Sequence, residues 1–286
     1  MEFIAISTAG KGDKGVSSPP PVDDDVSIYQ VSDLSDLELV SWLSREIWGE
    51  SASVSGPEMA VHLSYGGVVI IAKRGDGPVG FSYAFPAVVN KETILWSHET
   101  ACLERDSGLG FAMKLLQKKI AKDMGYSAIM WSYDPFVARN GYFNLVKLKA
   151  VVVSYKVNAY GKIEGDLQNP NLPTDRFIVR LDLDREGTDW ECKGPKEVVL
   201  SDMDGSPVVA EMPIGLEGPC AVAIPTSPWE EVRLDSDLAM AWIMAFRTVV
   251  SELFARGMVA VAPWTKGDHR IGGYLFCNPS KEEAGK

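Results

Sequence analysis

The feature that most constrains the fold is a short glycine-containing segment, RDSGLG at residues 105–110, which joins a strand pattern to a helix pattern. Before it, TILWSHETACL at 93–103 is typical of a strand. After it, apolar residues recur every four positions, which predicts an amphipathic helix over 109–124 that ends at Gly125. The two glycines suit a tight turn between these elements. The sequence therefore predicts helices layered on a sheet.

The same helix has a definite expected orientation. Its lysines are interpreted as its solvated face, because charged side chains usually stay in water. The expected buried stripe consists of Ala112, Leu116, Ile120 and Met124, with Leu115 beside them.

Periodicity also places strands and helices in a definite order along the chain. The order is strand, helix, helix, three strands, helix, strand, helix and strand, and one more alternating strand follows at 175–184. Asp33 is the expected cap of the first helix, and Gly49 its end. The expected strands are 26–31, 68–73, 79–85, 93–103, 127–133 and 150–157, and the expected helices are 34–47, a short one from Gly56, 109–124 and 138–148.

Composition divides the chain into three expected parts. Residues 1–25 contain glycines, serines, a triple proline and three consecutive aspartates, which predicts a disordered leader. Residues 26–184 carry the regular pattern and are expected to form the main domain. Residues 185–286 are expected to form an α/β extension, in which glycines and prolines break short strands and a long amphipathic helix covers 237–256.

Charge and composition exclude several classes of partner. The net charge of -11 disfavours nucleic acid, since an acidic protein repels phosphate backbones. The three histidines lack the spacing of metal ligands, so no metal is expected. No continuous apolar run approaches the roughly 20 residues that span a bilayer, so no membrane is expected either. The four cysteines form no close pair, which favours a reduced protein and a cytoplasmic location.

The 105–110 segment has a chemical interpretation beside the structural one. Backbone N–H groups at a helix N-terminus favour an anion, and glycine at 108 and 110 lets the backbone approach a pyrophosphate closely. The alternative is a strand-to-helix turn that needs glycine for its geometry alone. The flanking elements stand in the order that a phosphate site requires, which favours the first interpretation.

R-x-x-G-x-G after the fourth strand and before the third helix, within this order of elements, resembles the GNAT superfamily of acyl-CoA N-acyltransferases. The likeness covers about residues 26–184. It implies an α+β fold with a mixed central sheet and helices on both faces, here with a C-terminal extension. It also implies acetyl-CoA or another acyl-CoA as co-substrate.

Three later pieces resemble a subgroup of GNAT acetyltransferases with a C-terminal extension. They are WSYDP at 131–135, RN and YFN within 139–144, and LPTDRF at 172–177. Some members of that subgroup are thought to N-succinylate amino acids, including D-amino acids. The likeness therefore extends over nearly the whole folded chain.

The resemblance assigns roles to residues near the glycine segment. The amides of Gly108, Leu109, Gly110 and Phe111 are expected to hold the CoA pyrophosphate, with Arg105 at the mouth of the loop. The main chain at Cys102 and Leu103 is expected to pair with the pantetheine arm, in a register that is open by a residue or two because ACLER is shorter than the family's link. Asn140 and Asn144, four apart on the helix at 138–148, are expected on one face, where they bond the pantetheine or cap the turn at Asp134 and Pro135.

The base that deprotonates the acceptor amine depends on strand parity. Side chains alternate along a strand, so His98 is expected to share a face with Trp96, Thr100 and Cys102, while Glu99 faces the other way. If the face of His98 lines the acceptor site, His98 is the natural base, because its ordinary pKa lies near neutrality. Glu99 is the rival if the parity is reversed. A buried, hydrogen-bonded structural histidine is the alternative to either role.

The acid that protonates the leaving thiolate is less well marked. Many GNAT enzymes carry a tyrosine on the helix that corresponds to 138–148, but that position falls on Leu145, and Lys149 stands where the family has glycine. Tyr142, Tyr133 and water are the alternatives for the proton. Tyr142 as a core aromatic beside Phe143 is equally open.

A further set of charged residues has three interpretations. Surface salt bridges are preferred, and a buried network or a site for an acceptor carboxylate are the alternatives. The set consists of Asp134, Arg139, Asp175 and Arg176.

The sequence thus predicts an enzyme that transfers an acetyl or succinyl group from acyl-CoA to the primary amine of a small molecule, such as an amino acid, in a ternary complex. The alternative is a catalytically degenerate module that binds CoA or a metabolite, motivated by the missing tyrosine and the extension. Expected partners are acyl-CoA and the amine, and a homodimer is left open.

Overall fold

The protein was analysed as a computed structural model that describes residues 22–23, 25–104, 108–161, 172–184, 194–213, 218–266 and 270–278. Most of the expected leader and Arg105 lie outside these residues. The chain forms two compact units, and the division falls inside one strand, between Met130 and Trp131. The second unit also takes in residues 171–286. Each unit is described below by itself.

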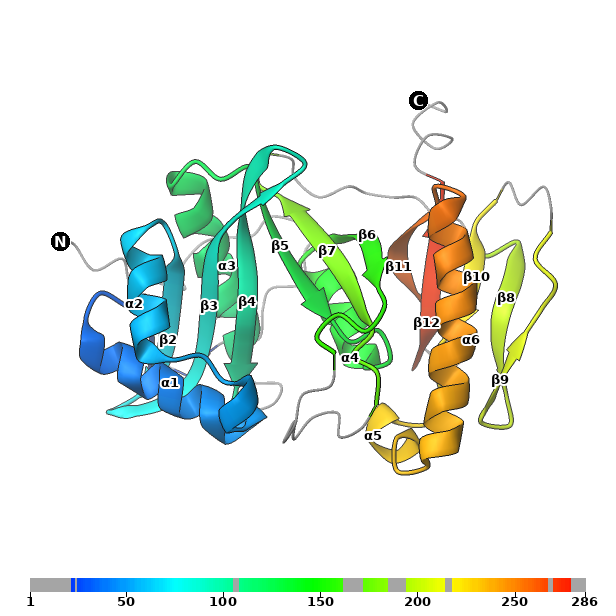
Figure 1. Cartoon of the computed structure of the whole chain (residues 1–286), viewed down its shortest axis with the longest axis horizontal. Coiled ribbons are helices and arrows are strands. Elements are labelled where there is room, and N and C mark those ends of the chain that lie inside the picture. Colours follow the sequence, from blue (N-terminus) through cyan, green and yellow to red (C-terminus); the bar gives the residue numbers. More distant parts are fainter. Residues whose placement is uncertain are drawn as a thin grey trace. The chain divides into compact units, whose positions relative to one another are not determined.

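The first unit contains a five-stranded sheet with helices on both faces (Figure 1). Its strand order follows the sequence, with antiparallel pairs from β1 to β4 and a parallel pair between β4 and β5. The elements are β1 (Val26–Gln30), α1 (Leu34–Trp48), η1 (Glu50–Ala52), α2 (Gly56–Ser64), β2 (Val68–Arg74), β3 (Gly77–Val89), β4 (Glu92–Cys102), α3 (Leu109–Asp123) and β5 (Ala128–Tyr133). The mixed α+β architecture expected from the sequence is thus present.

Local sequence explains why these elements begin and end where they do. The Asp33 side chain accepts a hydrogen bond from the Asp36 N–H and caps α1, and the Ser55 side chain caps α2, where proline occupies the first turn. Asn90 and Lys91 both have positive φ angles, of 50° and 69°, and this is the conformation of the tight hairpin turn that joins β3 to β4.

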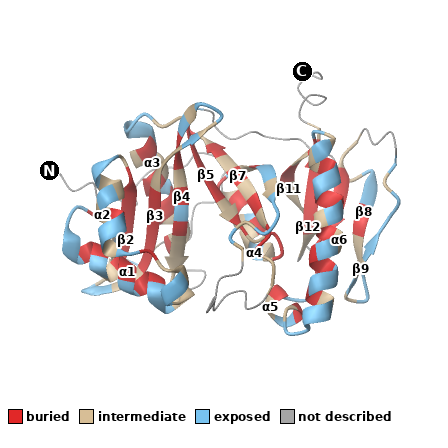
Figure 2. Cartoon of the chain, in the orientation of Figure 1, coloured by how far each residue is buried: buried red, intermediate tan, exposed pale blue. Residues whose placement is uncertain are grey.

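The core of the first unit lies on both faces of β2 and β3, whose centres are buried (Figure 2). Alternate residues of these strands, Val69 and Ile71 with Phe81 and Tyr83, pack with α1 and α2. The other face is covered by α3. Helices therefore cover both faces of the sheet, and the side chains of β4 point toward one face or the other.

The buried stripe of α3 differs from the expected one. It consists of Leu109, Met113, Lys114, Leu116, Gln117 and Ala121. Met124 is 46% exposed and Leu115 is 41% exposed, so the four-residue repeat that predicted the helix did not identify its inner face. Both arrangements have helical spacing, and a polar pair on the inner face concealed the true stripe from a search for apolar residues alone.

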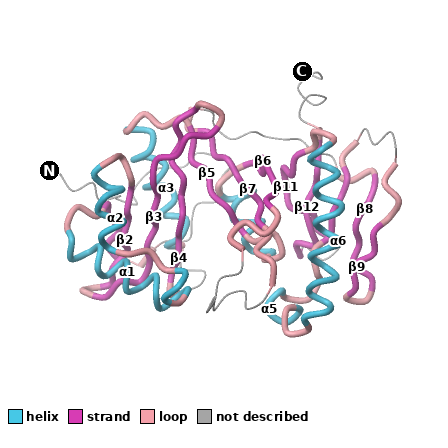
Figure 3. Tube along the Cα trace, in the orientation of Figure 1, coloured by secondary structure: helices cyan, strands magenta, loops and turns pink. Residues whose placement is uncertain are grey.

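The second unit contains a sheet in the order β7-β6-β11-β12-β10-β8-β9, with one long helix against it (Figure 3). All described pairs are antiparallel except β10 with β8. Its elements are α4 (Ala138–Gly141), η2 (Tyr142–Lys147), β6 (Val151–Lys156), β7 (Arg176–Asp182), β8 (Glu197–Met203), β9 (Ser206–Val209), β10 (Cys220–Ala223), α5 (Trp229–Val232), α6 (Ser236–Ala255), β11 (Val259–Lys266) and β12 (Arg270–Cys277).

Aromatic rings fill the core of the second unit. Phe177 of β7 is fully buried and contacts Phe246 and Phe254 of α6, as well as Tyr274 and Phe276 of β12. By length and composition α6 is apolar enough to cross a membrane. Its buried residues, which include Trp242 and Val249, make up one stripe of a core helix, and such a helix passes the same test.

The boundary between the units does not coincide with the one expected at residues 184 and 185. Strand β6, from the expected main domain, pairs with β7 on one side and with β11, from the expected extension, on the other. The C-terminal part of the chain therefore completes the sheet to which residues 151–182 belong. Sequence periodicity finds strands but does not say which strands pair.

Cysteine usage also differs from expectation. Cys277 is disulfide-bonded, whereas Cys102 and Cys220 are free, so its partner lies outside the described residues. The expectation of a fully reduced protein is wrong. The cytoplasmic location stays a prediction.

Candidate active site

The first unit has an irregularity in β4 at the two residues predicted as candidate bases. Tyr83 pairs with Glu99 and the next residue, Ala84, pairs with Ser97, so one extra residue of β4, His98, is accommodated by a bulge. A bulge reverses the alternation of side chains that follows it. The predicted parity is therefore wrong at this point, and His98 and Glu99 both contact groups on the α1 and α2 side of the sheet.

Glu99 is a buried carboxyl group with one hydrogen-bond donor from α1. Its side chain is 8% exposed, and its Oε2 accepts a hydrogen bond of 2.9 Å from the Ser44 hydroxyl. Ser44 in turn accepts a hydrogen bond of 3.2 Å from the Val54 N–H. Burial raises the pKa of Glu99 to about 7, although the bond from Ser44 opposes the rise. Near neutral pH this carboxyl group is poised to accept or release a proton.

His98 stands beside Glu99 at the surface. Its Nε2 lies 3.9 Å from Glu99 Oε1, and its side chain is 37% exposed. The surrounding protein still removes enough water to lower its pKa below the ordinary value of 6.5, an effect that Glu58 opposes and His62 reinforces. His98 is therefore largely uncharged near neutral pH.

Four rings, His98 among them, form a cluster on one side of the sheet. They belong to His62 of α2, Tyr83 and Phe85 of β3, and His98 of β4, with centroids between 5.1 and 5.9 Å apart in five ring pairs. His62 Nδ1 makes a short hydrogen bond with the Tyr83 hydroxyl. Tyr83 is fully buried, whereas His62 and Phe85 are partly exposed. We call these four residues the ring cluster.

A buried polar network supports the bulge from the opposite face. The Lys114 ammonium, on α3, donates hydrogen bonds of 2.7 Å to Ser97 Oγ and 3.2 Å to Gln117 Oε1. Gln117 donates a bond of 2.9 Å to Ser82 Oγ, which lies 2.8 Å from Thr100 Oγ1. Ser97 and Thr100 flank the bulge, so α3 holds β4 on both sides of the candidate bases.

Lys114 corrects the interpretation of the α3 lysines as a solvated face. It is only 5% exposed, and burial lowers its pKa to about 7. The spacing of Lys114 and Gln117 is a sequence signal for this pair: residues three apart lie on one side of a helix, here the side that packs against β4.

The N-terminus of α3 has the features expected of an anion site. Gly108 has a φ of 75°, in the left-handed region that favours glycine, and caps the helix. Among the described residues no side chain bonds to this cap, and the first turn contains no acidic residue that would repel an anion. The helix carries Leu109, Gly110 and Phe111 in its first turn, as predicted. Arg105 lies outside the described residues.

The predicted pantetheine contacts need one adjustment. The N–H of Leu103 already donates a hydrogen bond of 2.9 Å to Val79 on β3. Backbone groups alternate along a strand, so Cys102 directs its N–H and C=O to the other edge of β4. Within the described residues, pairing of that edge with β5 ends at Trp96. Of the two expected contacts we therefore keep Cys102 and drop the Leu103 N–H.

The remaining predicted site residues belong to the second unit, and their contacts with acyl-CoA stay predictions. Tyr142 is 42% exposed, and the Lys147 ammonium lies 5.7 Å from its ring centroid. Asn144 is buried, and its Oδ1 accepts a hydrogen bond of 3.0 Å from the Trp131 indole. Leu145, which stands where many GNAT enzymes carry the tyrosine acid, is buried, in keeping with a core side chain.

The helix expected at 138–148 is not uniform. Four residues form α4, and a π-helix, η2, follows from Tyr142 to Lys147. The wider turn of a π-helix breaks the four-residue spacing. The expectation that Asn140 and Asn144 share a face therefore lacks its basis.

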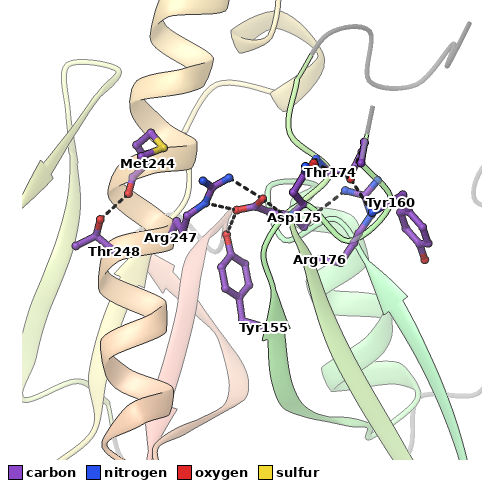
Figure 4. Close-up of polar contacts among 10 residues, drawn as sticks. Tyr155, Tyr160, Thr174, Asp175, Arg176, Met244, Arg247 and Thr248 are labelled. Carbon is purple, nitrogen blue, oxygen red and sulfur yellow. Dashed lines mark hydrogen bonds and ion pairs between the residues drawn. The ribbon is translucent and has the colours of Figure 1, made fainter. Parts of the chain in front are cut away.

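The charged residues of the second unit divide between surface and interior. Arg139 lies 3.5 Å from Glu230 with both side chains about half exposed, which confirms a surface pair. Asp175 is 3% exposed and sits in a buried network instead (Figure 4). Arg247 of α6 donates two hydrogen bonds to its carboxylate, of 2.9 and 3.0 Å, and Tyr155 and the Asn158 N–H donate two more. The preferred interpretation is thus wrong for Asp175.

Comparisons with known proteins give likeness at the level of structure. No protein-family model and no curated protein matches the chain. A GNAT-family acetyltransferase from Desulfovibrio desulfuricans is 18% identical, and the alignment covers 55% of this chain and 99% of that one with a TM-score of 0.42.

The structure resembles GNAT acetyltransferases. An acetyltransferase from Salmonella typhimurium, solved with acetyl-CoA, is 12% identical over 59% of this chain and 100% of its own, with a TM-score of 0.46. An aminoglycoside 6'-N-acetyltransferase from Enterococcus faecium is 15% identical over 56% of this chain and 98% of its own, with a TM-score of 0.42. Because these TM-scores lie below 0.5, we rest the function of this chain on its own residues.

Proposed function

We propose that the protein is an acyl-CoA-dependent N-acyltransferase of the GNAT type that acylates the primary amine of a small molecule. One observation carries this proposal. A bulge in β4 presents a buried carboxyl group, Glu99, whose pKa lies at about 7, and the same strand runs toward the glycine-capped N-terminus of α3. A base and an anion-binding helix end thus belong to neighbouring elements of one unit.

The residues of the first unit suit an acyl-CoA. The positive end of the α3 dipole and the amides of its first turn favour the pyrophosphate, and glycine at 108 and 110 leaves room for it. Arg105 is expected to add a charge at the mouth of this loop. Cys102 offers the outer edge of β4 to the amide groups of pantetheine, in the manner of an added strand.

The proposed reaction begins with Glu99 as an unprotonated carboxylate. Glu99 takes one proton from the acceptor ammonium and passes it to solvent. The nitrogen lone pair then forms a bond to the thioester carbonyl carbon, and the carbon–sulfur bond breaks with its electron pair leaving on CoA. The nitrogen's second proton reaches the thiolate through water. The products are an amide and free CoA thiol.

Glu99 replaces His98 as the preferred base because it is the more deeply buried of the two. His98, uncharged near neutral pH and 3.9 Å away, lines the approach to Glu99 and is the rival base. Tyr142 remains an expected alternative to water as the acid. Acetyl and succinyl groups are both proposed donors, and nothing in the first unit distinguishes them.

Binding and thiol release test the proposal together. Isothermal titration with acetyl-CoA and succinyl-CoA is expected to show binding, and a panel of amines is expected to release thiol. Binding without release for any amine would favour the degenerate module instead. Failure of both donors to bind at millimolar concentration would exclude the acyltransferase and a CoA-binding module, and would leave only a module that binds another metabolite.

The α3 loop has its own test in Gly110→Val. Gly110 lies in the first turn of α3, and a β-branched side chain there occupies the expected place of the pyrophosphate, so the Kd for acetyl-CoA is expected to rise at least about 100-fold. Leu115→Val on the exposed face of α3 is the matched control, because it introduces the same side chain away from the loop. Equal affinity of Gly110→Val and wild type would show that the loop has been assigned wrongly.

A further inference from the structure

The ring cluster is larger than a proton transfer needs. Glu99 and one proton path would suffice for deprotonation, yet four rings from three elements cluster beside it, with His98 Nε2 3.9 Å from Glu99 Oε1 and Tyr83 opposite Glu99 in the strand pairing. The partly exposed members, His62, Phe85 and His98, form the outward side of the cluster. Ring faces attract cations electrostatically, most strongly where water is partly excluded.

The charges around the ring cluster are mainly negative. Glu58 lies on α2 one helical turn before His62, so both project from the same side of that helix. Its charge acts on Tyr83, on His98 and on Glu99. Among the described residues, the groups whose charges shift these three pKa values are Glu58, Glu99 and His62; no lysine or arginine is among them.

This balance discriminates between classes of amine. An amino-acid acceptor brings a carboxylate close to its amine, and two carboxylates in the first unit repel it. An acceptor with a second ammonium gains from Glu58 and from the ring faces while the first ammonium is at Glu99. The amino-acid acceptor suggested by the sequence is therefore the less favoured class.

We propose that the acceptor is a dicationic or polycationic amine without a carboxylate, whose second ammonium is held between Glu58 and the ring cluster. This inference rests on the proposed function, because it names the substrate class of the same site. The proposal specifies the number of positive charges on the acceptor rather than one compound. The second ammonium is recognised by the partly exposed rings and by a carboxylate on α2.

Three acceptors of one chain length test the proposal: 1,5-diaminopentane, pentylamine and 5-aminopentanoate. With acetyl-CoA, kcat/KM for the diamine is expected to exceed that for pentylamine by about tenfold, the usual worth of one partly exposed cation site, and 5-aminopentanoate is expected to be poorest. A monoamine or amino acid that equals or exceeds the diamine would overturn the proposal. The same ranking in Kd, measured by titration, decides it without turnover.

The Glu58→Gln variant tests whether Glu58 binds the second ammonium of the acceptor. It keeps the shape of the side chain and removes its charge, so the ratio of diamine to pentylamine is expected to fall to about two or less. Glu38→Gln, on the exposed side of α1, makes the same change in net charge and is expected to leave the ratio unchanged. An unchanged ratio in Glu58→Gln would overturn the assignment. Absence of acetyl-CoA binding would instead reject the proposed function, while the amine titrations still judge the site.

Discussion

Each unit buries a carboxylate, and the two carboxylates differ in how well they are compensated. Asp175 in the second unit receives two hydrogen bonds from Arg247 and two more from Tyr155 and a backbone amide. Glu99 in the first unit receives one from the residues that the structure describes, donated by the neutral hydroxyl of Ser44. Burial therefore raises the pKa of Glu99 to about 7.

The difference separates structural from chemical use of a buried charge. A fully paired carboxylate fixes the elements around it, here the turn after β6 and helix α6. A carboxyl group with one neutral donor is costly to keep charged and is ready to take a proton. Lys114, which donates hydrogen bonds to Ser97 and Gln117 and whose pKa burial lowers to about 7, is a second buried group in the first unit that can exchange a proton near neutral pH.

The largest expected effect is on turnover in Glu99→Gln. Loss of the base is expected to lower kcat by roughly 10²–10⁴-fold while the Kd for acetyl-CoA barely changes. In wild type, kcat/KM is expected to rise with pH through about 7, because the carboxylate must be unprotonated, and the variant is expected to lose this limb. Assays of thiol release from pH 5.5 to 9 measure both quantities.

His98→Ala is the control that decides between the two candidates. If Glu99 is the base, this variant keeps the pH limb and loses less activity than Glu99→Gln. The reverse pattern would return the role to His98.

The stability of the protein gives an independent test of the raised pKa of Glu99. The folded pKa of Glu99 lies above its ordinary 4.5, so its contribution to stability is lost as pH rises from about 4.5 through about 7. Glu99→Gln is then expected to be more stable than wild type at pH 8.

The next effect is on stability in Arg247→Met. Removing the cation leaves the buried Asp175 carboxylate with only the neutral donors Tyr155 and the Asn158 N–H, which is expected to lower the free energy of unfolding by about 3–5 kcal/mol. Arg256→Met is the matched control on the same helix, since Arg256 pairs with the half-exposed Glu252, and its expected loss is under about 1 kcal/mol. Urea unfolding measures both. Equal losses in the free energy of unfolding would show that the Asp175 network contributes no more to stability than the Arg256–Glu252 pair.

The smallest effect concerns Lys114→Met. The folded pKa of Lys114, about 7, lies below its ordinary 10.5, so the unfolded chain binds more protons between these values and stability rises with pH across that window. The variant is expected to lose on the order of 1–3 kcal/mol of this rise between pH 7 and pH 10. Lys119→Met, on the exposed side of α3, should retain it. A rise that survives in Lys114→Met would contradict the pKa shift.

The sequence predicted most elements because each carries a local signal. The cap at Asp33, the glycine at the start of α3 and the apolar runs of β2 and α6 act within a few residues, and local sequence patterns detect such signals. The glycine loop and both candidate bases were found in this way.

The rest depends on contacts between distant residues. The bulge at His98 is set by pairing between β3 and β4, so alternation along one strand predicted the wrong face for Glu99 relative to His98. The buried face of α3 includes Lys114 because Ser97 accepts a hydrogen bond from its ammonium, and no local pattern reports that partner. The π-helix at Tyr142 is likewise invisible to a four-residue repeat.

The pairing of β6 with β11 has a consequence for any shortened form of the protein. A fragment that stops at residue 184, the expected end of the main domain, keeps β6 and β7 but loses β11, β12 and α6. It would expose one bare strand edge and strip Phe177 of the rings from α6 and β12. Open edges recruit other chains. Such a fragment is expected to aggregate, and its inactivity would say nothing about catalysis.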